Sequence, residues 1–263
     1  MFEAYSEKYY EVADKHDNWD GPTQVKILEF IKNHYQAGQL VVELGCGSAN
    51  ITEFLPNDLR YLGLDSSPAA LVKAKARSVK LLSAEFQQSG DEKINLLSGT
   101  ANFMLCFYVL EHLHRPKEML AEMARILAPG GFLILLAPNV EFPFSRLNAL
   151  RHKNLFFKIW WFGLRLIDYL SRIFGHFRFR TIAENFSEAV GHYEKLDDDL
   201  TYAVSSYEVI SFLQSLGLKL EFVGQPQFSA NFLGRMKKLV NLLPAMKYYG
   251  DILFVIMKKP ISQ

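Results

Sequence analysis

The stretch that decides the fold is Val41-Val42-Glu43-Leu44-Gly45-Cys46-Gly47-Ser48-Ala49-Asn50, an apolar run followed by an acid and two closely spaced glycines. The short apolar run is typical of a buried β-strand, and the glycines permit a tight turn into a helix. Such a turn lets a ligand approach the unpaired N–H groups that begin a helix. The stretch therefore predicts a ligand site at the carboxyl end of a strand, although a tight turn without a ligand fits the same pattern.

Strand-like and helix-like segments alternate on both sides of this stretch. The periodicity predicts strands at 39–44, 59–64, 85–89, 102–108, 132–137, 218–223 and 251–257. It predicts helices at 22–35, 68–82, 117–127 and 206–216 and another that starts at 51–55, with Pro129-Gly130-Gly131 ending helix 117–127. Short connections between strands and helices favour parallel strands with right-handed crossovers, and thus a doubly wound α/β sheet. Ligands of such sheets bind at the carboxyl ends of the strands.

Acidic residues follow the first three strands. Asp65 ends the second strand 22 residues after Glu43, and Asp91 follows the third. An acid at the second position can accept hydrogen bonds from ribose hydroxyls, and an acid at the third can accept one from the exocyclic amine of adenine. Three acids suit a nucleoside without phosphates, since Glu43 would repel a pyrophosphate. Asn50 also replaces the last glycine of the G-x-G-x-x-G loop, which disfavours a nicotinamide cofactor.

Residues 38–140 resemble the class I S-adenosylmethionine-dependent methyltransferases. Glu43 to Gly47 is similar to the first motif of that family, Asp65 to its ribose-binding acid, and Asp91 with Glu92 to its adenine-side pair. The resemblance implies a Rossmann-like, mostly parallel seven-stranded sheet whose last strand, 251–257, runs antiparallel. It also implies the cofactor S-adenosyl-L-methionine, with S-adenosyl-L-homocysteine as its product.

A second group of motifs supports the same resemblance. Residues 110–113 read Leu-Glu-His-Leu, and residues 123–131 read Met-Ala-Arg-Ile-Leu-Ala-Pro-Gly-Gly. Together they are similar to a run found in the subgroup that includes the ubiquinone-pathway methyltransferases, and Ala137-Pro138-Asn139 fits as well. The resemblance says little about the methyl acceptor.

Two positions depart from the family pattern. Ala49 stands where the family often has a third glycine, and alanine can replace it if its φ stays negative. Asn102 stands where the family usually has an aspartate, and we expect little effect on cofactor binding.

The motif positions predict a set of side chains that contact the cofactor. One of them comes from an N-terminal segment that, in similar enzymes, closes over the methionine end of the cofactor; packing on the sheet is the alternative for Tyr9, Tyr10 and Trp19. Cys46 is expected to be unreactive, because no base is indicated beside it. The predicted cofactor-binding residues are Glu43, Gly45, Cys46, Gly47, Asp65, Ser66, Asp91, Glu92, Phe107 and Tyr10.

The candidate catalytic residue is His112, which follows the fourth predicted strand. Methyl transfer depends chiefly on orientation and desolvation, and a general base is needed only for some acceptors. A histidine that caps the local turn is the alternative for His112, and Glu111 is expected to be structural. No metal site is predicted, because His112 and His114 lack a third ligand and residues 197–199 fit a solvated acidic loop.

Residues 141–200 interrupt the alternation and predict an inserted helical lid. Between 146 and 180 there are eight Lys or Arg residues and one acid, Asp168, and nine aromatic residues lie between 156 and 179. A helix over 154–174 would carry its charges on one narrow stripe, which is typical of an interfacial helix or a lid for a lipophilic acceptor and not of a membrane span. A helix buried against the main domain or a second subunit is the alternative, and RNA is the weaker one.

These observations predict a single domain over 1–263, with a helical cover at 1–37, a cofactor-binding core at 38–140, the lid at 141–200, and a helix and strands at 201–263 that complete the sheet. The expected function is S-adenosylmethionine-dependent methyl transfer to a small or lipid-like molecule, with oxygen favoured as the acceptor atom. A cofactor-binding protein without catalysis and an RNA-directed methyltransferase are the alternatives.

Composition adds expectations about the setting of the protein. The 263 residues carry a net charge of +1 and two cysteines. Because the net charge is low, no DNA partner is expected. The low cysteine count predicts a cytoplasmic setting, and residues 154–176 predict peripheral contact at the inner membrane face. The sequence does not predict the oligomeric state.

Overall fold

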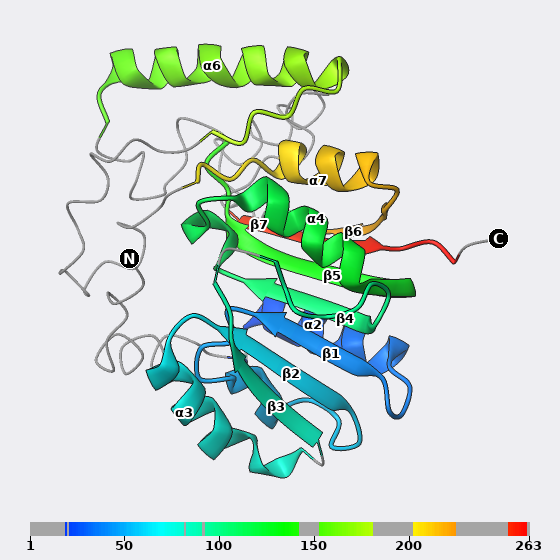
Figure 1. The fold of residues 1–263 in the computed structure, drawn as a ribbon. Helices are drawn as coiled ribbons and strands as arrows, with labels where there is room; N and C mark the ends of the chain where they lie inside the picture. Colours follow the sequence, from blue (N-terminus) through cyan, green and yellow to red (C-terminus); the bar gives the residue numbers. More distant parts are fainter. Residues whose placement is uncertain are drawn as a thin grey trace. The chain divides into compact units, whose positions relative to one another are not determined.

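The computed structural model describes residues 19, 21–81, 83–90, 93–141, 153–180, 202–224 and 252–261. Seven strands form one sheet in the order β3-β2-β1-β4-β5-β7-β6, and β7 runs antiparallel (Figure 1). The strand order therefore reverses at β1, with β2 and β3 on one side and β4 and β5 on the other. This arrangement confirms the predicted seven-stranded, mostly parallel sheet.

Most predicted elements are confirmed within a few residues. The strands are β1 (Leu40–Leu44), β2 (Arg60–Asp65), β3 (Ser83–Gln88), β4 (Ala101–Phe107), β5 (Leu127–Pro138), β6 (Lys219–Val223) and β7 (Ile252–Lys258). The α-helices are α2 (Pro22–His34), α3 (Pro68–Arg77), α4 (Pro116–Ile126), α6 (Leu155–Ile173) and α7 (Ser206–Ser215). Three short 3-10 helices are η1 (Asn50–Glu53), η2 (Ser78–Lys80) and η3 (Leu110–His112).

Two local predictions were wrong. The helix expected from 51–55 is only the 3-10 turn η1, and Pro56 accounts for its early end because a proline disfavours helical geometry in the residue before it. The Pro129-Gly130-Gly131 run does not lie between α4 and the next strand, since β5 already begins at Leu127. The N–H of Gly130 donates to the carbonyl of Lys259, and the N–H of Lys259 donates to the carbonyl of Gly131. A residue distant in the sequence therefore completes the hydrogen bonding at the start of β5.

The chain forms two compact units, and the first contains the described residues of 19–109, 118–134 and 258–261. In this unit β1 pairs in parallel with both β2 and β4 (Figure 1). The register aligns Leu44 with Leu64 and also with Cys106. The loop after β1, Asp65 and Phe107 therefore emerge at the same edge of the sheet.

The core of the first unit explains why β1 and β4 are continuous apolar runs. Val41, Val42, Phe103 and Met104 are almost completely buried, as expected for central parallel strands covered on both faces. The end of α4 is fastened by Lys259, whose ammonium group donates to the carbonyls of Ala124, Leu127 and, at 3.4 Å, Arg125. These bonds satisfy carbonyls that a helix terminus leaves unpaired.

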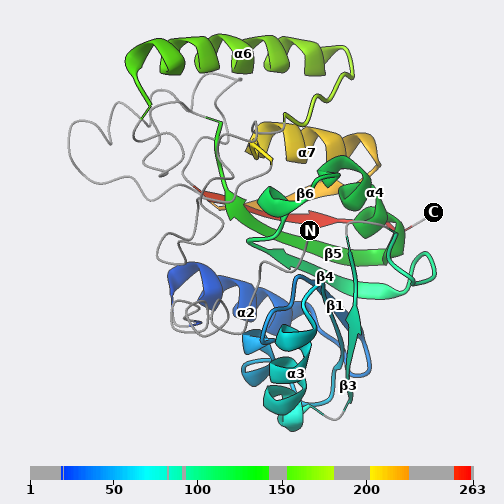
Figure 2. The same ribbon diagram turned by 60° about the vertical axis from the view of Figure 1, so that its left-hand side comes forward.

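The second unit consists of residues 110–117 and the described residues between 135 and 257, and it includes α6 and α7. Figures 1 and 2 show α6 as one uninterrupted helix. The side chain of Asn154 caps its start by accepting from the N–H of Phe157 at 2.8 Å, and Ser205 caps α7 in the same way. None of the helices in the described ranges is long and apolar enough to cross a membrane.

The orientation of α6 differs from that of an ordinary amphipathic helix. Arg165, Asp168 and Arg172, three of the four residues of the predicted polar stripe, are buried, while most large apolar side chains of α6 are exposed. The apolar face of α6 is therefore not buried against the described residues of this chain, and a helix packed on a second subunit stays a prediction.

Candidate active site

The loop after β1 makes a sharp turn held by its backbone. Gly45, Gly47 and Ala49 have positive φ values of 69°, 51° and 55°. The N–H groups of Gly45 and Cys46 both donate to the carbonyl of Leu64, at 2.7 and 3.0 Å. This loop therefore folds against the end of β2.

Asp65 connects that loop with the segment after β2. Its two carboxylate oxygens accept hydrogen bonds from the N–H of Gly47 and the N–H of Ser67, each at 2.8 Å. The side chain is buried, and its backbone carbonyl accepts from the N–H of Ser89 after β3. These bonds fix the Asp65 carboxylate at the end of β2, the position where a ribose-binding acid is predicted.

Glu43 lies in β1, one strand away, and is paired with a buried phenol. The hydroxyl of Tyr61 in β2 donates to the Glu43 carboxylate. Burial and the neighbouring Glu43 raise the pKa of Tyr61 well above its ordinary value, so the phenol stays a donor. Tyr61 thereby holds the Glu43 carboxylate within the strand.

The pKa of the Cys46 thiol reflects the negative charge around the loop. Burial raises the pKa of its thiol far above the ordinary range, and the charges of Glu43 and Asp65 raise it further. The thiol is therefore protonated, which agrees with the expectation that Cys46 is not a nucleophile. The same two carboxylates make the environment of the loop unfavourable for a phosphate and favourable for a cation.

Phe107, at the end of β4, is partly exposed and meets the ring of Trp19 edge-on at 5.7 Å. Trp19 also stacks on Phe54 at 6.4 Å, so it packs within the first unit, as one of its two predicted roles requires. Ser66 follows Asp65 directly and its carbonyl accepts from the side chain of Gln88. Predicted site residues from three strand ends are thus brought to one edge of the first unit.

Three predicted cofactor contacts, Tyr10, Asp91 and Glu92, lie outside the described residues, as do Tyr9 and the acidic residues 197–199. Their roles stay predictions.

His112 belongs to η3 in the second unit. Its Nε2 atom lies 3.9 Å from a carboxylate oxygen of Glu111, and its side chain is partly exposed. Glu111 is buried, and its backbone carbonyl accepts from the N–H of Tyr202, in agreement with a structural role. His112 as the base stays a prediction.

Three residues in the strands of this site or directly after them were not identified from the sequence. A Cβ atom built on Gly45 would lie 2.1 Å from Cγ2 of Val109, so this valine closes the space behind the loop. Tyr108 has a φ of 55° and an exposed side chain, a strained conformation that is frequent at functional sites. Only Tyr61 carried a usable signal, because a phenol in a buried strand needs a hydrogen-bond partner.

Ala49 does not meet the condition set for it from the sequence. Its φ is 55° and its ψ 42°, so it adopts the left-handed conformation that a glycine would take there. This conformation carries a penalty of about 1–2 kcal/mol for a residue with a Cβ atom. The alanine therefore replaces the glycine with a positive φ, not with the negative φ that an unstrained replacement requires.

A substitution measures this strain. Ala49→Gly and Ala74→Gly both remove a buried methyl group, but only the first relieves a left-handed alanine. We expect Ala49→Gly to lower the free energy of unfolding by about 2–3 kcal/mol less than Ala74→Gly does, because the relieved strain of about 1–2 kcal/mol adds to the penalty of about 1 kcal/mol for a glycine inside α3. Urea denaturation of both variants measures the difference, and a difference of only about 1 kcal/mol would mean that Ala49 is unstrained.

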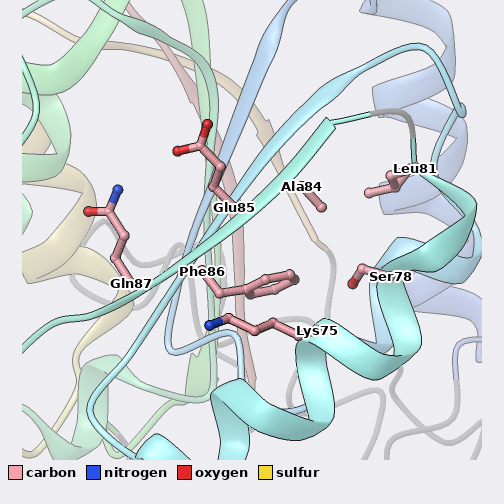
Figure 3. A pocket seen from close by; sticks show the side chains of 7 residues that line it. All are labelled: Lys75, Ser78, Leu81, Ala84, Glu85, Phe86 and Gln87. Atoms are coloured by element: carbon pink, nitrogen blue, oxygen red, sulfur yellow. The ribbon is translucent and has the colours of Figure 1, made fainter.

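A hollow of about 590 Å³ lies elsewhere in the first unit, between β3 and the end of α3. Figure 3 shows the ring of Phe86 pointing toward α3, while Glu85 and Gln87 point away from it. None of the residues that line this hollow belongs to the predicted cofactor site. It is therefore a separate surface feature at the edge strand β3.

The described residues fit an S-adenosyl group. The turn has no side chain at Gly45 and Gly47, the Asp65 carboxylate lies at the end of β2, where a ribose acceptor is predicted, and Glu43 adds a second carboxylate. In the part of the chain that the structure describes, no three His, Cys, Asp or Glu side chains are grouped to hold a metal ion.

Comparison with known proteins agrees with this geometry. A family model described as a methyltransferase domain matches residues 42–135. The chain is 37% identical over 111 residues to a trans-aconitate 2-methyltransferase of Methylobacterium nodulans, a match covering 41% of this chain and 42% of that protein. It is 30% identical over 136 residues to a ubiquinone biosynthesis O-methyltransferase of Methylococcus capsulatus, covering 47% of this chain and 57% of that protein.

A solved structure of a putative methyltransferase from Bacillus halodurans has a TM-score of 0.56 at 12% identity, covering 90% of this chain and 99% of that one, which shows a common fold. The chain spans about half of the length of the curated relatives described above. Residues 42–135 of this chain therefore belong to the class I S-adenosylmethionine-dependent methyltransferase family, whose cofactor is S-adenosylmethionine.

Proposed function

We propose that the protein is an S-adenosylmethionine-dependent methyltransferase that acts on a small or lipophilic molecule, with oxygen as the acceptor atom. The observation that carries the proposal is the junction of Asp65 with the backbone of Gly47 and Ser67, which builds a carboxylate into the loop itself. When bound, S-adenosylmethionine supplies a methyl group activated by its own sulfonium charge.

The chain contributes recognition and placement. Asp65 is positioned to accept from the ribose hydroxyls, and the left-handed turn at Gly45 and Gly47 brings the backbone of the loop to the same strand edge. Glu43, held by Tyr61, favours a cation near the loop. Because the acceptor must lose a proton when oxygen is methylated, a base is useful where that oxygen is weakly acidic, and we assign this role to His112.

A labelling experiment tests the proposed activity. The full chain is incubated with methyl-labelled S-adenosylmethionine and the small-molecule and lipid fractions of a lysate, and labelled products are identified by mass spectrometry. We expect a methylated product with the wild-type chain and, at limiting S-adenosylmethionine, markedly less of it with Asp65→Ala. Binding of S-adenosylhomocysteine without any labelled product would instead indicate a cofactor-binding protein without catalysis, and label only in RNA would indicate an RNA-directed enzyme.

The role of His112 has its own test. With the acceptor found above, His112→Gln should lower kcat by about 10²- to 10⁴-fold, the usual contribution of a general base, and should leave the affinity for S-adenosylhomocysteine unchanged. His114→Gln, two residues along and exposed, is the matched control and should keep wild-type kcat. An unchanged kcat in His112→Gln would contradict the role of a base. A lower kcat accompanied by a lower melting temperature would indicate that His112 is a structural residue.

A further inference from the structure

The most unusual surface of the described chain is the outward face of α6. Large apolar side chains crowd this face, among them two phenylalanines that are about four-fifths exposed. The exposed apolar residues are Leu155, Phe156, Ile159, Trp160, Phe162, Leu166, Ile167, Leu170 and Ile173, with Phe174 directly after the helix. Their exposed area is on the order of 1,000 Å², given about 150–250 Å² for an aromatic side chain, whereas monomers rarely expose apolar patches larger than a few hundred Å².

Charged contacts within the second unit hold the opposite side of α6. The guanidinium of Arg180 donates to both carboxylate oxygens of Asp168, at 2.5 and 2.8 Å. Arg165 donates to the carbonyl of Ala203 at 2.7 Å. The buried stripe is thus anchored by a bidentate ion pair, a geometry that fixes orientation as well as distance.

Further along α6 the anchoring continues. Arg172 lies 3.8 Å from the Glu141 carboxylate and 4.0 Å from that of Glu208 at the start of α7. Glu208 in turn accepts from the backbone N–H groups of Arg178 and Phe179. Rotating α6 about its axis to bury the apolar face would break these ion pairs and leave buried charges without partners. The ion pairs therefore keep the apolar face exposed.

The charge around this face indicates what covers it. The segment 146–180 carries eight Lys or Arg residues and one acid, Asp168. Two of these bases, Arg165 and Arg172, are buried, and Arg178 and Arg180 lie beside Asp168. Lys153 and Lys158 lie partly exposed at one end of α6, and Arg178 is half exposed beyond the other end. A second copy seated face to face would oppose like charges, whereas an anionic lipid surface complements a basic border and accepts an apolar face.

We propose that α6 is a docking helix that lies flat on the surface of an anionic membrane, with its apolar face in the boundary between headgroups and acyl chains. The buried charged stripe, Arg165, Asp168 and Arg172, keeps this face outward before the membrane is met. This inference goes beyond methyl transfer and does not depend on it.

Vesicle binding of the full chain tests the proposal. We expect the chain to float with vesicles of phosphatidylcholine and phosphatidylglycerol in equal parts and to bind pure phosphatidylcholine at least about tenfold more weakly. Raising the salt from about 0.1 M to about 1 M, which shortens the Debye length from about 10 Å to about 3 Å, should also weaken binding. No binding to the anionic vesicles would overturn the proposal.

Exposed apolar residues elsewhere provide a matched control. Phe156 and Phe174 are 81% and 78% exposed, and Val79 and Leu97 in the first unit are 80% and 79% exposed. The double substitution Phe156→Glu with Phe174→Glu should reduce partition onto anionic vesicles by at least about tenfold, since it removes two inserted rings and adds two repelled charges. Val79→Glu with Leu97→Glu should bind like wild type, and equal losses in the two double variants would refute a specific face.

Two neighbouring tryptophans report the orientation of α6. Trp160 is 51% exposed, whereas Trp161 is 7% exposed and donates to the carbonyl of Val140. Brominated lipids should therefore quench wild-type fluorescence, and Trp160→Phe should remove that quenching while Trp161→Phe keeps it. The opposite pattern would mean that another side of α6 meets the lipid, contrary to the proposal.

The remaining outcomes identify other occupants of the face. A dimer in light scattering that is lost in the Phe156→Glu and Phe174→Glu variant, without vesicle binding, would assign the face to a second copy and overturn the proposal. Tight binding of RNA without vesicle binding would overturn it as well. Calorimetry with S-adenosylhomocysteine on the same variants keeps the two proposals separate, because its result should not change with any substitution in α6.

Discussion

Asp65→Ala should weaken the binding of S-adenosylhomocysteine by about 1–3 kcal/mol, which corresponds to about 5- to 150-fold in Kd. The variant loses the acceptor for the ribose hydroxyls. It also loses the carboxylate that fixes the N–H groups of Gly47 and Ser67 at 2.8 Å. Titration calorimetry with the full chain measures the change.

The same substitution should lower stability, because the two backbone bonds form without the cofactor. Leaving buried donors unpaired costs about 1–3 kcal/mol for each group, so folding of Asp65→Ala is checked by circular dichroism. Asp65→Asn keeps one acceptor oxygen, so its affinity for S-adenosylhomocysteine should lie between those of the wild-type chain and Asp65→Ala. Asp58→Ala, an exposed aspartate before β2, is the control, and an unchanged Kd in Asp65→Ala would place the ribose elsewhere.

Gly45→Ala should lower the free energy of unfolding by about 2–4 kcal/mol, through two separable effects. The φ of 69° penalises any residue with a Cβ atom, and that atom would lie 2.1 Å from Cγ2 of Val109. Because the loop must shift to relieve the clash, the affinity for S-adenosylhomocysteine should fall at least about tenfold, the equivalent of about 1.4 kcal/mol. Urea denaturation and calorimetry measure the two losses.

Two further variants separate the two effects. Gly38 also has a positive φ, 77°, but a Cβ atom there would meet nothing within 4 Å, so Gly38→Ala should show the backbone penalty alone. Adding Val109→Ala to Gly45→Ala should relieve the clash and restore the stability lost through it. The backbone penalty should remain. If Gly45→Ala and Gly38→Ala destabilise equally, close packing of Val109 against the loop is not important for the site.

The strands and the ligand loop could be predicted because their determinants are local. A few neighbouring residues are enough to predict each of these features: the apolar runs of β1 and β4, the glycines at 45 and 47, and the acid that ends β2. Register then follows, since parallel pairing of β1 with β2 brings Gly45 and Asp65 to the same edge.

Other features depend on residues that are distant in the sequence, and these could not be predicted. Strand β5 begins at Leu127 where its ladder is completed by Lys259, and the strain at Ala49 depends on how the loop closes. The inward polar stripe of α6 was missed for the same reason. Its periodicity identified the stripe, but the partners that bury it, Arg180 and Glu208, lie in other segments.

The central claim is that the edge formed by Glu43, Gly45, Gly47 and Asp65 binds a nucleoside that carries no phosphate. Titration calorimetry of the full chain with S-adenosylhomocysteine and, in parallel, with NADH tests it most directly. We predict saturable binding of one S-adenosylhomocysteine per chain and no heat with NADH. A chain that gives no heat with S-adenosylhomocysteine, or that binds NADH more tightly, would contradict the claim.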